Sequence, residues 1–528
     1  MQDHSFTIDN SGAEPAINYA PVFNVAATFI DRHRDEGRAG KTAIYAIDGD
    51  DVSYGELAEN VNRAGNVLKQ RGLDAGDRML MMVKDSPEFY YLFWGAIKSG
   101  VVPVPINTLL RAKDFKFMIK DSGCRAVVYS PEFKGEVEPA LASLSNPPDV
   151  QMMTTAANDA LDTGMASAYS ELTPAKTASD DDCFWLYSSG TTGTPKGAVH
   201  LHRDMVETSF HYGQNTLGLK EDDICFSAAK LFFAYGLGNG MTFPLFVGAS
   251  AVLLPGPPTP DSTFDAIENY HPSVYFGVPT LYAAQLKALE TESRDLSSLR
   301  ACVSAGEALP ADIFKRWRDK TGTIILDGIG STEALHIFIS NVLDDVCPGA
   351  SGRIVEGYQA RILDDSGHDV AKGESGRLLI KGASSAKYYW NNPEKTASTM
   401  VDGWLDTGDT YYQDDQGYFH YCGRNDDMLK VGGIWCSPFE IEAKLIEHEK
   451  VLEAAVVGRA DDAGLIKPEA FIVLNDKADA GDGLAKELLE HCKSGLAKYK
   501  YPRWFEFVDD LPKTATGKIK RFELRKQS

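Results

Sequence analysis

An alternation of strand and helix patterns constrains the fold of this chain most. Residues 78–83 and 101–105 have the apolar composition of buried strands, and a helical pattern over 86–99 separates them. A capping box at residues 53–56 begins an earlier helix, which we expect to end near Arg71. Strands that alternate with helices form parallel sheets covered on both faces. The pattern therefore predicts an α/β fold with doubly covered sheets. Residues 154–182 are polar and are predicted to be a loop.

The composition is that of an ordinary globular protein. Of 528 residues, 43% are hydrophobic and 24% are charged, and the formal net charge is −22. This charge disfavours nucleic acid and anionic membrane surfaces as partners, because both are polyanions. It does not exclude ATP or coenzyme A, which need only local positive charge.

The targeting and cysteine patterns indicate a cytoplasmic location. No run of 18 apolar residues and no basic-then-apolar start is present, so we expect neither a membrane span nor a signal peptide. The eight cysteines are scattered without CxxC spacing. This pattern predicts neither a metal or redox pair nor a disulfide framework.

A glycine-rich stretch, Tyr187 to Gly197, indicates a phosphate-binding loop. A short buried strand over 184–187 precedes it, and its glycines let backbone N–H groups turn toward an anion. Its hydroxyls donate further hydrogen bonds, and Lys196 adds positive charge. It is not a Walker loop, because Pro195 interrupts the required Gly-Lys pair. The alternative interpretation is a plain polar surface loop.

A second motif follows a predicted strand over 324–326. It is Asp327-Gly328-Ile329-Gly330-Ser331-Thr332-Glu333, and a carboxylate at Glu333 is suited to hold Mg²⁺ bound to ATP phosphates. The alternative is a helix N-terminal Glu that the helix dipole favours. The Gly-x-Gly does not continue to Gly-x-Gly-x-x-Gly, which rejects a dinucleotide fingerprint.

Three motifs lie toward the C-terminus, and each is weak alone. Residues 404–409 end in Asp409, which is suited to accept both ribose hydroxyls; residues 423–430 form a charged run; and residues 511–519 place Gly517 before Lys518. The alternatives are a turn, a solvated charge run and a basic tail. A separate strand–helix pattern over the last hundred residues predicts a large N-terminal domain, 1–424, and a small α+β domain, 425–528.

The order of all these motifs resembles that of the adenylate-forming superfamily, which includes acyl-CoA synthetases, peptide-synthetase adenylation domains and firefly luciferase. The resemblance covers nearly the whole chain. The strings at 228–239, 304–310 and 327–338 are similar to the benzoate-CoA ligase family, which includes 4-hydroxybenzoate-CoA ligases. The resemblance implies that ATP converts an aryl carboxylate to an acyl-adenylate and pyrophosphate, after which coenzyme A displaces AMP.

The resemblance also implies the roles of individual residues in nucleotide binding and catalysis. The ATP phosphates are expected to be held by Ser188, Ser189, Gly190, Thr191, Thr192, Gly193 and Lys196. The adenine and ribose are expected to be bordered by Gly306, Glu307, Asp327, Gly328, Asp409 and Arg424. Lys518 would bridge the substrate carboxylate and the α-phosphate, Glu333 would hold Mg²⁺, and Thr332 would assist at phosphate.

By the same resemblance, the aryl pocket is lined by Ala234, Tyr235, Gly277, Ala305, Ile329 and His336. Small and flat apolar residues suit a planar ring, although core packing is the alternative for Tyr235 and His336. The coenzyme A segment comprises Lys430, Gly432, Gly433 and Trp435, and the hinge between the domains is Asp426. Gly432 and Trp435 depart from the family, where Ser and Tyr are common, so details of the coenzyme A tunnel differ.

Other functions stay open at this point. A carrier-loading adenylation enzyme shares most motifs, as does a luciferase-like oxygenase, and a non-catalytic nucleotide-binding protein is a different class. A serine hydrolase is excluded because no Gly-x-Ser-x-Gly elbow is present. The residues do not distinguish benzoate from 4-hydroxybenzoate, and they leave the oligomeric state open, with a homodimer as one option.

Overall fold

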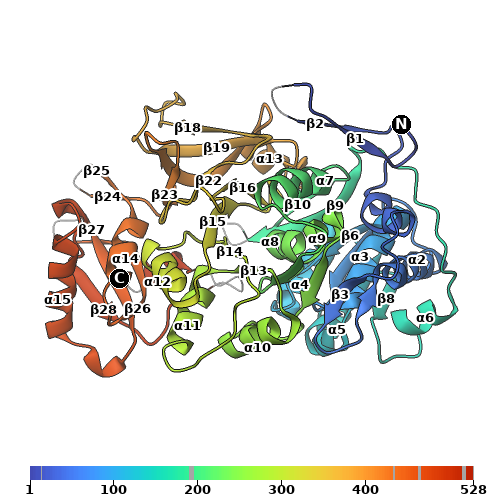
Figure 1. Ribbon diagram of the computed structural model, residues 1–528, viewed down its shortest axis with the longest axis horizontal. Helices are drawn as coiled ribbons and strands as arrows, with labels where there is room; N and C mark the ends of the chain where they lie inside the picture. The colour runs from blue at the N-terminus through green and yellow to red at the C-terminus, as the bar shows by residue number, and fades with distance from the viewer. Residues whose placement is uncertain (13–14, 190–194, 432–433, 462–464, 514–518, 527–528) are drawn as a thin grey trace.

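A computed structural model describes residues 1–12, 15–189, 195–431, 434–461, 465–513 and 519–526 (Figure 1). The N-terminal elements and the last hundred residues lie at opposite ends of an elongated molecule (Figure 1). A small antiparallel hairpin of β1 (Phe6–Asp9) and β2 (Ala16–Tyr19) begins the chain. Within the described part of the chain, every helix is too short or too polar to span a bilayer.

The larger of two α/β sheets has nine strands in the order β17-β16-β15-β14-β13-β11-β12-β3-β4. The strands are β3 (Thr42–Ala46), β4 (Val52–Ser53), β11 (Ile224–Ser227), β12 (Ser250–Leu253), β13 (Val274–Gly277), β14 (Ala301–Ser304), β15 (Ile325–Gly330), β16 (Ile337–Ser340) and β17 (Arg353–Ile354). The pairings from β3 to β15 are parallel, and β4, β16 and β17 add antiparallel edges.

The second sheet is entirely parallel, in the order β6-β5-β7-β8. Its strands are β5 (Arg78–Met82), β6 (Val102–Pro105), β7 (Ala126–Tyr129) and β8 (Val150–Met153). The predicted strands at 78–83 and 101–105 are therefore confirmed. The predicted capping box is also present, because the Glu56 amide donates to Ser53 Oγ and the Ser53 amide donates to the Glu56 carboxylate.

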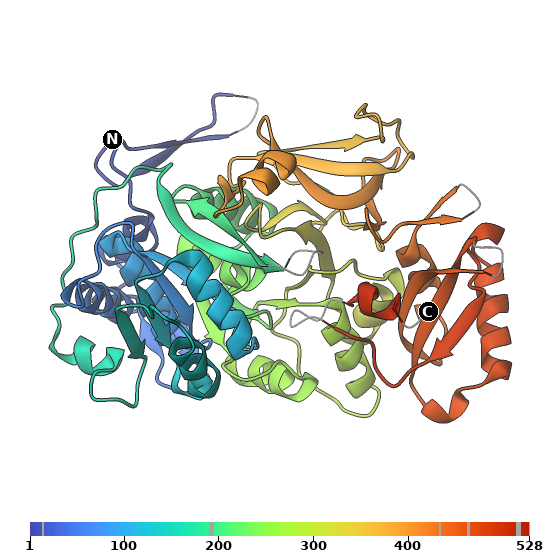
Figure 2. The ribbon, with the colours of Figure 1, turned by 180° about the vertical axis from the view of Figure 1, so that it is seen from behind.

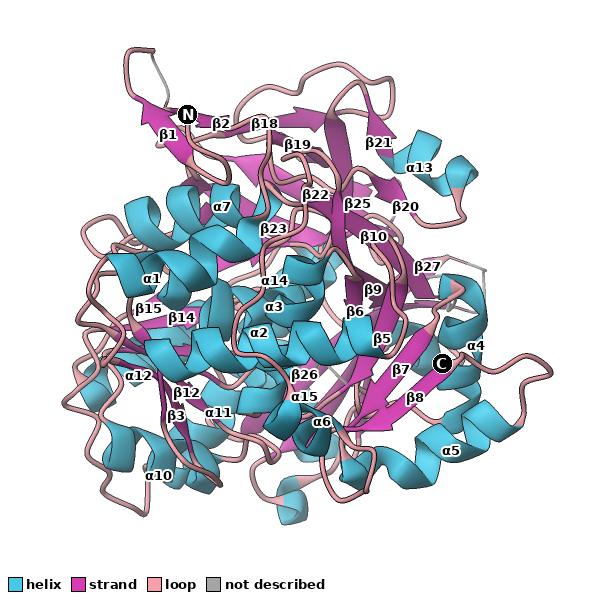
Figure 3. Cartoon of the chain, turned by 90° about the vertical axis from the view of Figure 1, so that its right-hand side faces the viewer, coloured by secondary structure: helices cyan, strands magenta, loops and turns pink. Residues whose placement is uncertain are grey.

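Helices cover both faces of these sheets, as the alternating pattern predicts (Figure 3). Helices α2 (Tyr54–Gln70) and α3 (Pro87–Ser99) lie between the two sheets, and their Val61 and Phe93 share one apolar cluster with strand residues Ile44 and Met79. The outer faces are covered by α4 (Ala112–Ser122), α5 (Lys134–Ala142), α10 (Pro260–Tyr270), α11 (Pro279–Ala288) and α12 (Ala311–Thr321). Burial on both faces explains why the strands are nearly continuously apolar.

Antiparallel strands form the rest of the N-terminal part. One sheet contains β9 (Asp182–Ser189), β10 (Pro195–Leu201) and β20 (Tyr388–Tyr389); another contains β18 (Tyr358–Leu363), β19 (Gly376–Gly382), β21 (Met400–Val401), β22 (Trp404–Gln413) and β23 (Phe419–Arg424). Figure 2 shows the β9–β10 hairpin pointing toward the side of the molecule that carries the C-terminal part.

Shorter helices complete this region. They are α1 (Arg32–Asp35), α6 (Leu161–Ser167), α7 (Asp204–Thr208), α8 (Ala234–Leu237), α9 (Phe243–Val247) and α13 (Pro393–Thr399), with π-helical turns η1 (Ala27–Asp31), η3 (Ser209–Thr216) and η4 (Gly238–Thr242) and the 3₁₀ turn η2 (Pro131–Phe133). Helix α6 corrects the prediction of a loop over 154–182. Its Leu161 and Met165 are buried in the core cluster that includes α2, and one such pair is too short to give a periodic signal.

The last hundred residues have their own core. They form β24 (Leu429–Val431), β25 (Ile434–Cys436), α14 (Pro438–Ile446), β26 (Val451–Ala460), β27 (Ile466–Leu474), η5 (Lys477–Asp479), α15 (Asp482–Lys493), η6 (Lys498–Lys500), β28 (Trp504–Phe507) and α16 (Arg521–Leu524). Ile441 and Leu445 of α14 pack with Leu488 of α15 against the β26–β27 pair. The division at residues 424 and 425 stays a prediction.

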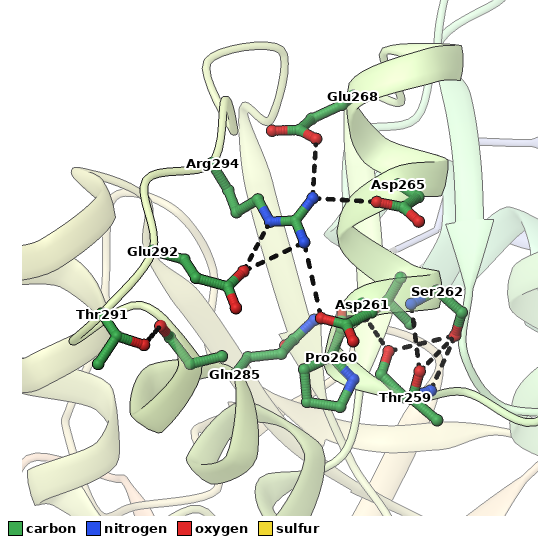
Figure 4. Close-up of polar contacts among 12 residues, drawn as sticks. Thr259, Pro260, Asp261, Ser262, Asp265, Glu268, Gln285, Thr291, Glu292 and Arg294 are labelled. Carbon is green, nitrogen blue, oxygen red and sulfur yellow. Dashed lines mark hydrogen bonds and ion pairs between the residues drawn. The ribbon is translucent and has the colours of Figure 1, made fainter.

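One exposed ion-pair cluster fixes the loop that follows α11 to helix α10 (Figure 4). The Arg294 guanidinium lies 3.0 Å from Asp265, 3.2 Å from Glu268, 3.1 Å from Glu292 and 3.6 Å from Asp261. A single cation therefore screens four carboxylates from one another. Exposed ion pairs each contribute little to stability, but the contribution of the whole network can be tested by removing its one cation.

We expect Arg294→Ala to lower the melting temperature, because four carboxylates then repel one another across a small space. The loss should shrink in about 1 M salt, where the Debye length is about 3 Å. Arg318→Ala is the matched control, since Arg318 pairs with its chain neighbour Asp319 and should change stability little. Equal losses at low and high salt would show that packing, not charge, is what Arg294 contributes.

Candidate active site

The predicted phosphate loop is the turn of an antiparallel hairpin. Ser188 of β9 lies opposite Lys196 of β10, and Ser189 lies opposite Pro195. The pairing therefore delivers a hydroxyl and an ammonium from the two strand ends to the same place. The predicted phosphate ligands Gly190, Thr191, Thr192 and Gly193 lie outside the described residues.

Glu333 connects this hairpin with two other parts of the chain. Its Oε1 accepts hydrogen bonds from Ser188 Oγ at 3.1 Å and from the Tyr389 hydroxyl at 2.8 Å. Lys196 Nζ lies 5.0 Å from the centre of the Tyr389 ring. Burial lowers the pKa of Lys196, and the Glu333 carboxylate opposes this effect. The structure thus gathers hydroxyls, one carboxylate and one cation at a single point.

Tyr389 was not predicted from the sequence. It lies in β20, which pairs with β10 so that Tyr389 is opposite Ala198. The only available signal was the aromatic string Tyr388-Tyr389-Trp390, which is equally typical of core packing. Only the pairing of β20 with the phosphate hairpin brings the Tyr389 hydroxyl to Glu333.

Strand β15 continues through the second motif, which corrects its predicted end at residue 326. Gly328 pairs with Ser340 and Gly330 with Ile337 of β16. A Cβ atom on Gly330 would lie 2.5 Å from the carbonyl oxygen of His336, so only glycine permits this approach. Glycines weaken a strand signal in sequence, which is why the strand seemed to end earlier.

The predicted adenine-bordering residues lie around the ends of β14 and β15. Asp327 is buried, and its Oδ2 accepts a hydrogen bond from the Leu309 amide at 3.3 Å. Burial raises the pKa of Asp327 well above its usual range. Gly306 has a φ of +94°, a backbone conformation that favours glycine.

Asp409 and Arg424 face each other across the β22–β23 pair. Arg424 Nη1 donates to Asp409 Oδ1 and to the Thr407 carbonyl oxygen, each at 3.0 Å. Asp409 is 9% exposed. The charge-assisted bond keeps a carboxylate oriented at the end of a strand, which suits the ribose role predicted for it.

The predicted pocket residues meet at the carboxyl ends of β13, β14 and β15, where binding sites of parallel sheets commonly lie. The Tyr235 hydroxyl is 3.2 Å from the carbonyl oxygens of both Gly277 and Val303. The Tyr235 and His336 rings lie 5.6 Å apart, centre to centre. The other predicted lining residues are either buried, as Ala234 and Ala305 are, or half-buried, as Ile329 is.

His336 is a buried neutral imidazole. Its Nε2 faces the Tyr235 carbonyl oxygen at 3.3 Å and Asn239 Oδ1 at 3.1 Å, and burial lowers its pKa to about 3. A Cβ atom on Gly238 would lie 2.4 Å from the His336 ring. Gly238 of the 236–240 string therefore makes room for the His336 side chain.

The C-terminal part meets this site at Ile519. An isolated antiparallel bridge joins Ile519 to Lys513, and the Ile519 amide donates to Glu307 Oε1 at 3.2 Å. Lys518 lies outside the described residues, as do Gly432 and Gly433. Trp435 is 46% exposed and Lys430 Nζ lies 5.2 Å from its ring centre.

Asp426, the predicted hinge, lies between β23 and β24. Its carbonyl oxygen accepts a hydrogen bond from Arg525 Nη1 at 3.2 Å, just beyond α16. Among the described residues, no group of three or more His, Cys, Asp or Glu side chains forms a metal cage. A single carboxylate such as Glu333 is the kind of protein ligand that Mg²⁺ bound to phosphates and water uses.

Comparison with known proteins agrees with this geometry. The AMP-binding enzyme family model matches residues 31–390, and the model of the AMP-binding enzyme C-terminal domain matches 440–518. The chain belongs to the AMP-binding enzyme family. It is 50% identical to the benzoate–CoA ligase of Thauera aromatica, with 98% of each chain covered. The identity to the 4-hydroxybenzoate–CoA/benzoate–CoA ligase of Rhodopseudomonas palustris is 46%, covering 96% of this chain and 94% of that one.

A solved structure of similar shape is the anthranilate CoA ligase AuaEII in complex with anthranoyl-AMP. Its TM-score is 0.92 at 40% identity, covering 96% of this chain and 98% of that chain. The fold of a large α/β part and a small C-terminal part is therefore that of adenylate-forming enzymes.

We expect Asp327→Asn to stabilise the protein increasingly as pH rises. Because burial raises the pKa of Asp327, its contribution to the free energy of unfolding is complete below about pH 4 and declines as pH rises toward the folded-state pKa. Asparagine removes this decline, so the difference from the parent should grow by up to about 1.4 kcal/mol per pH unit. Urea unfolding between pH 4.5 and 7.5 measures it.

Asp345→Asn is a control of opposite sign. Hydrogen bonds from Tyr418 and Arg353 lower the pKa of Asp345, so its contribution is present above about pH 4 and is lost as pH falls. This variant should therefore lose stability relative to the parent only as pH rises toward about 4, and its difference from the parent should stay constant between pH 4.5 and 7.5. A difference for Asp327→Asn that did not vary with pH would contradict a raised pKa of Asp327.

Proposed function

We propose that this protein is an acyl-CoA synthetase that activates benzoate with ATP and transfers the acyl group to coenzyme A. The observation that carries the proposal is the meeting of Ser188, Lys196 and Glu333, which brings a hydroxyl, an ammonium and a carboxylate together. The rings of Tyr235 and His336, which the motifs predict to line the aryl pocket, lie 5.6 Å apart. The identity to a benzoate–CoA ligase over nearly the whole chain supports the same substrate.

In the first step, a carboxylate oxygen of benzoate attacks the α-phosphorus of ATP and pyrophosphate leaves. The protein's work is to hold the reactants in line and to stabilise negative charge, as in other phosphoryl-type transfers. Lys196 and the hydroxyls of the β9–β10 hairpin hold the phosphates, and Asp409 holds the ribose. Lys518 bridges the substrate carboxylate and the α-phosphate. Mg²⁺, held by Glu333 with Thr332 beside the phosphate, would neutralise charge on the phosphates.

In the second step, the thiol sulfur of coenzyme A attacks the acyl carbon and AMP leaves with the bonding electrons. A swing of the small domain about Asp426 would exchange the Lys518 hairpin for the segment that carries Lys430, Gly432, Gly433 and Trp435. This is an ordinary hinge motion. The exposed position of Trp435 leaves it available for such a rearrangement. Soluble cofactors and scattered reduced cysteines suit a cytoplasmic enzyme.

A second candidate substrate is 4-hydroxybenzoate. Because Nε2 of His336 faces two acceptors, the ring hydrogen lies on Nε2 and Nδ1 is left as an acceptor. This buried Nδ1 has no hydrogen-bond partner among the described residues. A ring hydroxyl that reached it could donate to it, whereas benzoate leaves it unused. The name of the Rhodopseudomonas palustris relative includes both 4-hydroxybenzoate and benzoate, which supports 4-hydroxybenzoate as the second candidate.

Lys518→Ala separates the two half-reactions. We expect pyrophosphate release to fall by about 10²–10³, because one preorganised charged donor is lost where charge develops. Thioester formation from supplied benzoyl-adenylate should change little. Lys520→Ala is a nearby control, since Lys520 Nζ pairs with Glu523 at 3.1 Å. Equal losses in both half-reactions would contradict the role of Lys518.

A panel of acids tests the substrate. We expect benzoate to have the highest kcat/KM, with 4-hydroxybenzoate lower, acetate poor and octanoate excluded. Each CH₂-sized group missing from the pocket forfeits about 0.8 kcal/mol. Ala234→Leu should depress benzoate turnover far more than it weakens ATP binding, because Ala234 is buried at the pocket.

Other outcomes of the panel identify the alternatives. A preference for 4-hydroxybenzoate that His336→Ala abolishes would support the second substrate. Turnover of octanoate above benzoate would contradict the aryl assignment while leaving the adenylate chemistry intact. ATP binding with no pyrophosphate release from any acid would indicate a non-catalytic nucleotide-binding protein.

A further inference from the structure

A buried histidine joins the two elements proposed to bind phosphate. His200 lies on β10 of the phosphate hairpin and is fully buried. Its Nδ1 is 2.9 Å from Asp204 Oδ2, at the start of α7, and its Nε2 is 2.8 Å from the carbonyl oxygen of Thr332. The histidine therefore lies between the hairpin that carries Lys196 and the turn that carries Thr332 and Glu333.

The partners of His200 determine which ring nitrogen carries a hydrogen. A carbonyl oxygen can only accept, so His200 Nε2 carries a hydrogen and donates it to Thr332. Asp204 orients the ring from the other side, and its own Oδ2 also accepts from the Leu201 amide at 3.0 Å. Burial raises the pKa of the Asp204 carboxyl. Phe184 stacks on the ring at 5.3 Å and limits its rotation.

The Thr332 turn is held from outside at three successive carbonyl groups. His200 binds the carbonyl of Thr332, the Ala386 amide donates to Glu333 at 2.7 Å, and Ser384 Oγ donates to Ala334 at 2.8 Å. Leu335 follows with a φ of +67°, a costly conformation for a bulky residue. A turn of this kind persists only when its surroundings hold it in place.

We infer that His200, oriented by Asp204, is a positioning residue that fixes the distance between the phosphate hairpin and the Thr332–Glu333 turn. The inference rests on the proposed function, because it concerns how ATP and its cation are held for the first half-reaction. Of the three outside donors, His200 is the one that comes from the phosphate hairpin itself. Movement of Lys196 relative to Glu333 is therefore resisted through His200.

Substitution of His200 by Gln or by Asn tests the contributions of its two ring nitrogens separately. In His200→Gln the amide nitrogen can take the place of Nε2 and still donate to Thr332. In His200→Asn it takes the place of Nδ1, which keeps the Asp204 contact and loses the Thr332 bond. Both variants remove the same aromatic stacking on Phe184, so each is the other's control for lost packing.

We expect His200→Asn to slow pyrophosphate release with benzoate about tenfold and to raise the Mg²⁺ concentration that is required, as the loss of a buried hydrogen bond implies. His200→Gln should stay within about threefold of the parent. Thioester formation from supplied benzoyl-adenylate should be nearly unchanged in both. Equal losses in the two variants that track their melting temperatures would overturn the inference, because they would indicate a structural role only.

Binding of ATP with Mg²⁺, measured by calorimetry, tests the inference independently of the proposed function. Weaker binding in His200→Asn than in His200→Gln supports the inference even if the parent releases no pyrophosphate from benzoate, a result that would overturn the proposed function instead. Equal binding in both overturns the inference.

If neither His200 variant folds, two substitutions of Asp204 test the inference instead. Asp204→Asn can still donate from its amide nitrogen to His200 Nδ1, although it then loses the hydrogen bond from the Leu201 amide. Binding and pyrophosphate release should therefore fall less in Asp204→Asn than in Asp204→Ala, which should lose about as much as His200→Asn. Equal behaviour of the two Asp204 variants would overturn the inference.

Discussion

The hydrogen bonds that Glu333 accepts from Ser188 and Tyr389 are the interaction on which the site depends. They join three segments that are distant in sequence: the phosphate hairpin, the turn after β15, and β20. Each segment belongs to a different pairing of strands, so no one of them can place the carboxylate alone. The register of β10 against β9 and against β20 therefore decides whether a cation and a carboxylate meet.

Close backbone packing gives the aryl pocket its shape. Gly238 lets the His336 ring approach α8 and η4, and Gly330 lets the backbone after β15 fold back against itself. Tyr235 is then held by the carbonyl oxygens at the ends of β13 and β14. Because the carboxyl ends of parallel strands lie at one edge of a sheet, the small residues that are predicted to line the aryl pocket come together from separate strands.

Burial separates the charged from the uncharged groups of the site. Burial raises the pKa of Asp327 and lowers that of His336 to about 3, since an ion in either place would lose its hydration without a close partner of opposite charge among the described residues. Asp409, in contrast, keeps Arg424 at 3.0 Å, so its carboxylate stays oriented. The uncharged form is thus favoured at the place proposed for the ring, while the place proposed for the ribose carries an oriented carboxylate. This division suits a substrate with an apolar ring and a nucleotide with hydroxyl groups.

The sequence by itself determined the α/β class, the strands at 78–83 and 101–105, the Ser53–Glu56 cap, and the set of motifs that indicates adenylate formation, because these are properties of short segments or of exact strings. It could not give α6, whose two buried apolar residues leave no periodic signal, nor the extension of β15 through glycines. The positions of Tyr389 and His200 in the site also could not be predicted from the sequence. Their contacts with this site exist only because β20 and β10 pair beside the Thr332–Glu333 turn. A contact across such distances in the chain is decided by tertiary packing, which local sequence patterns do not encode.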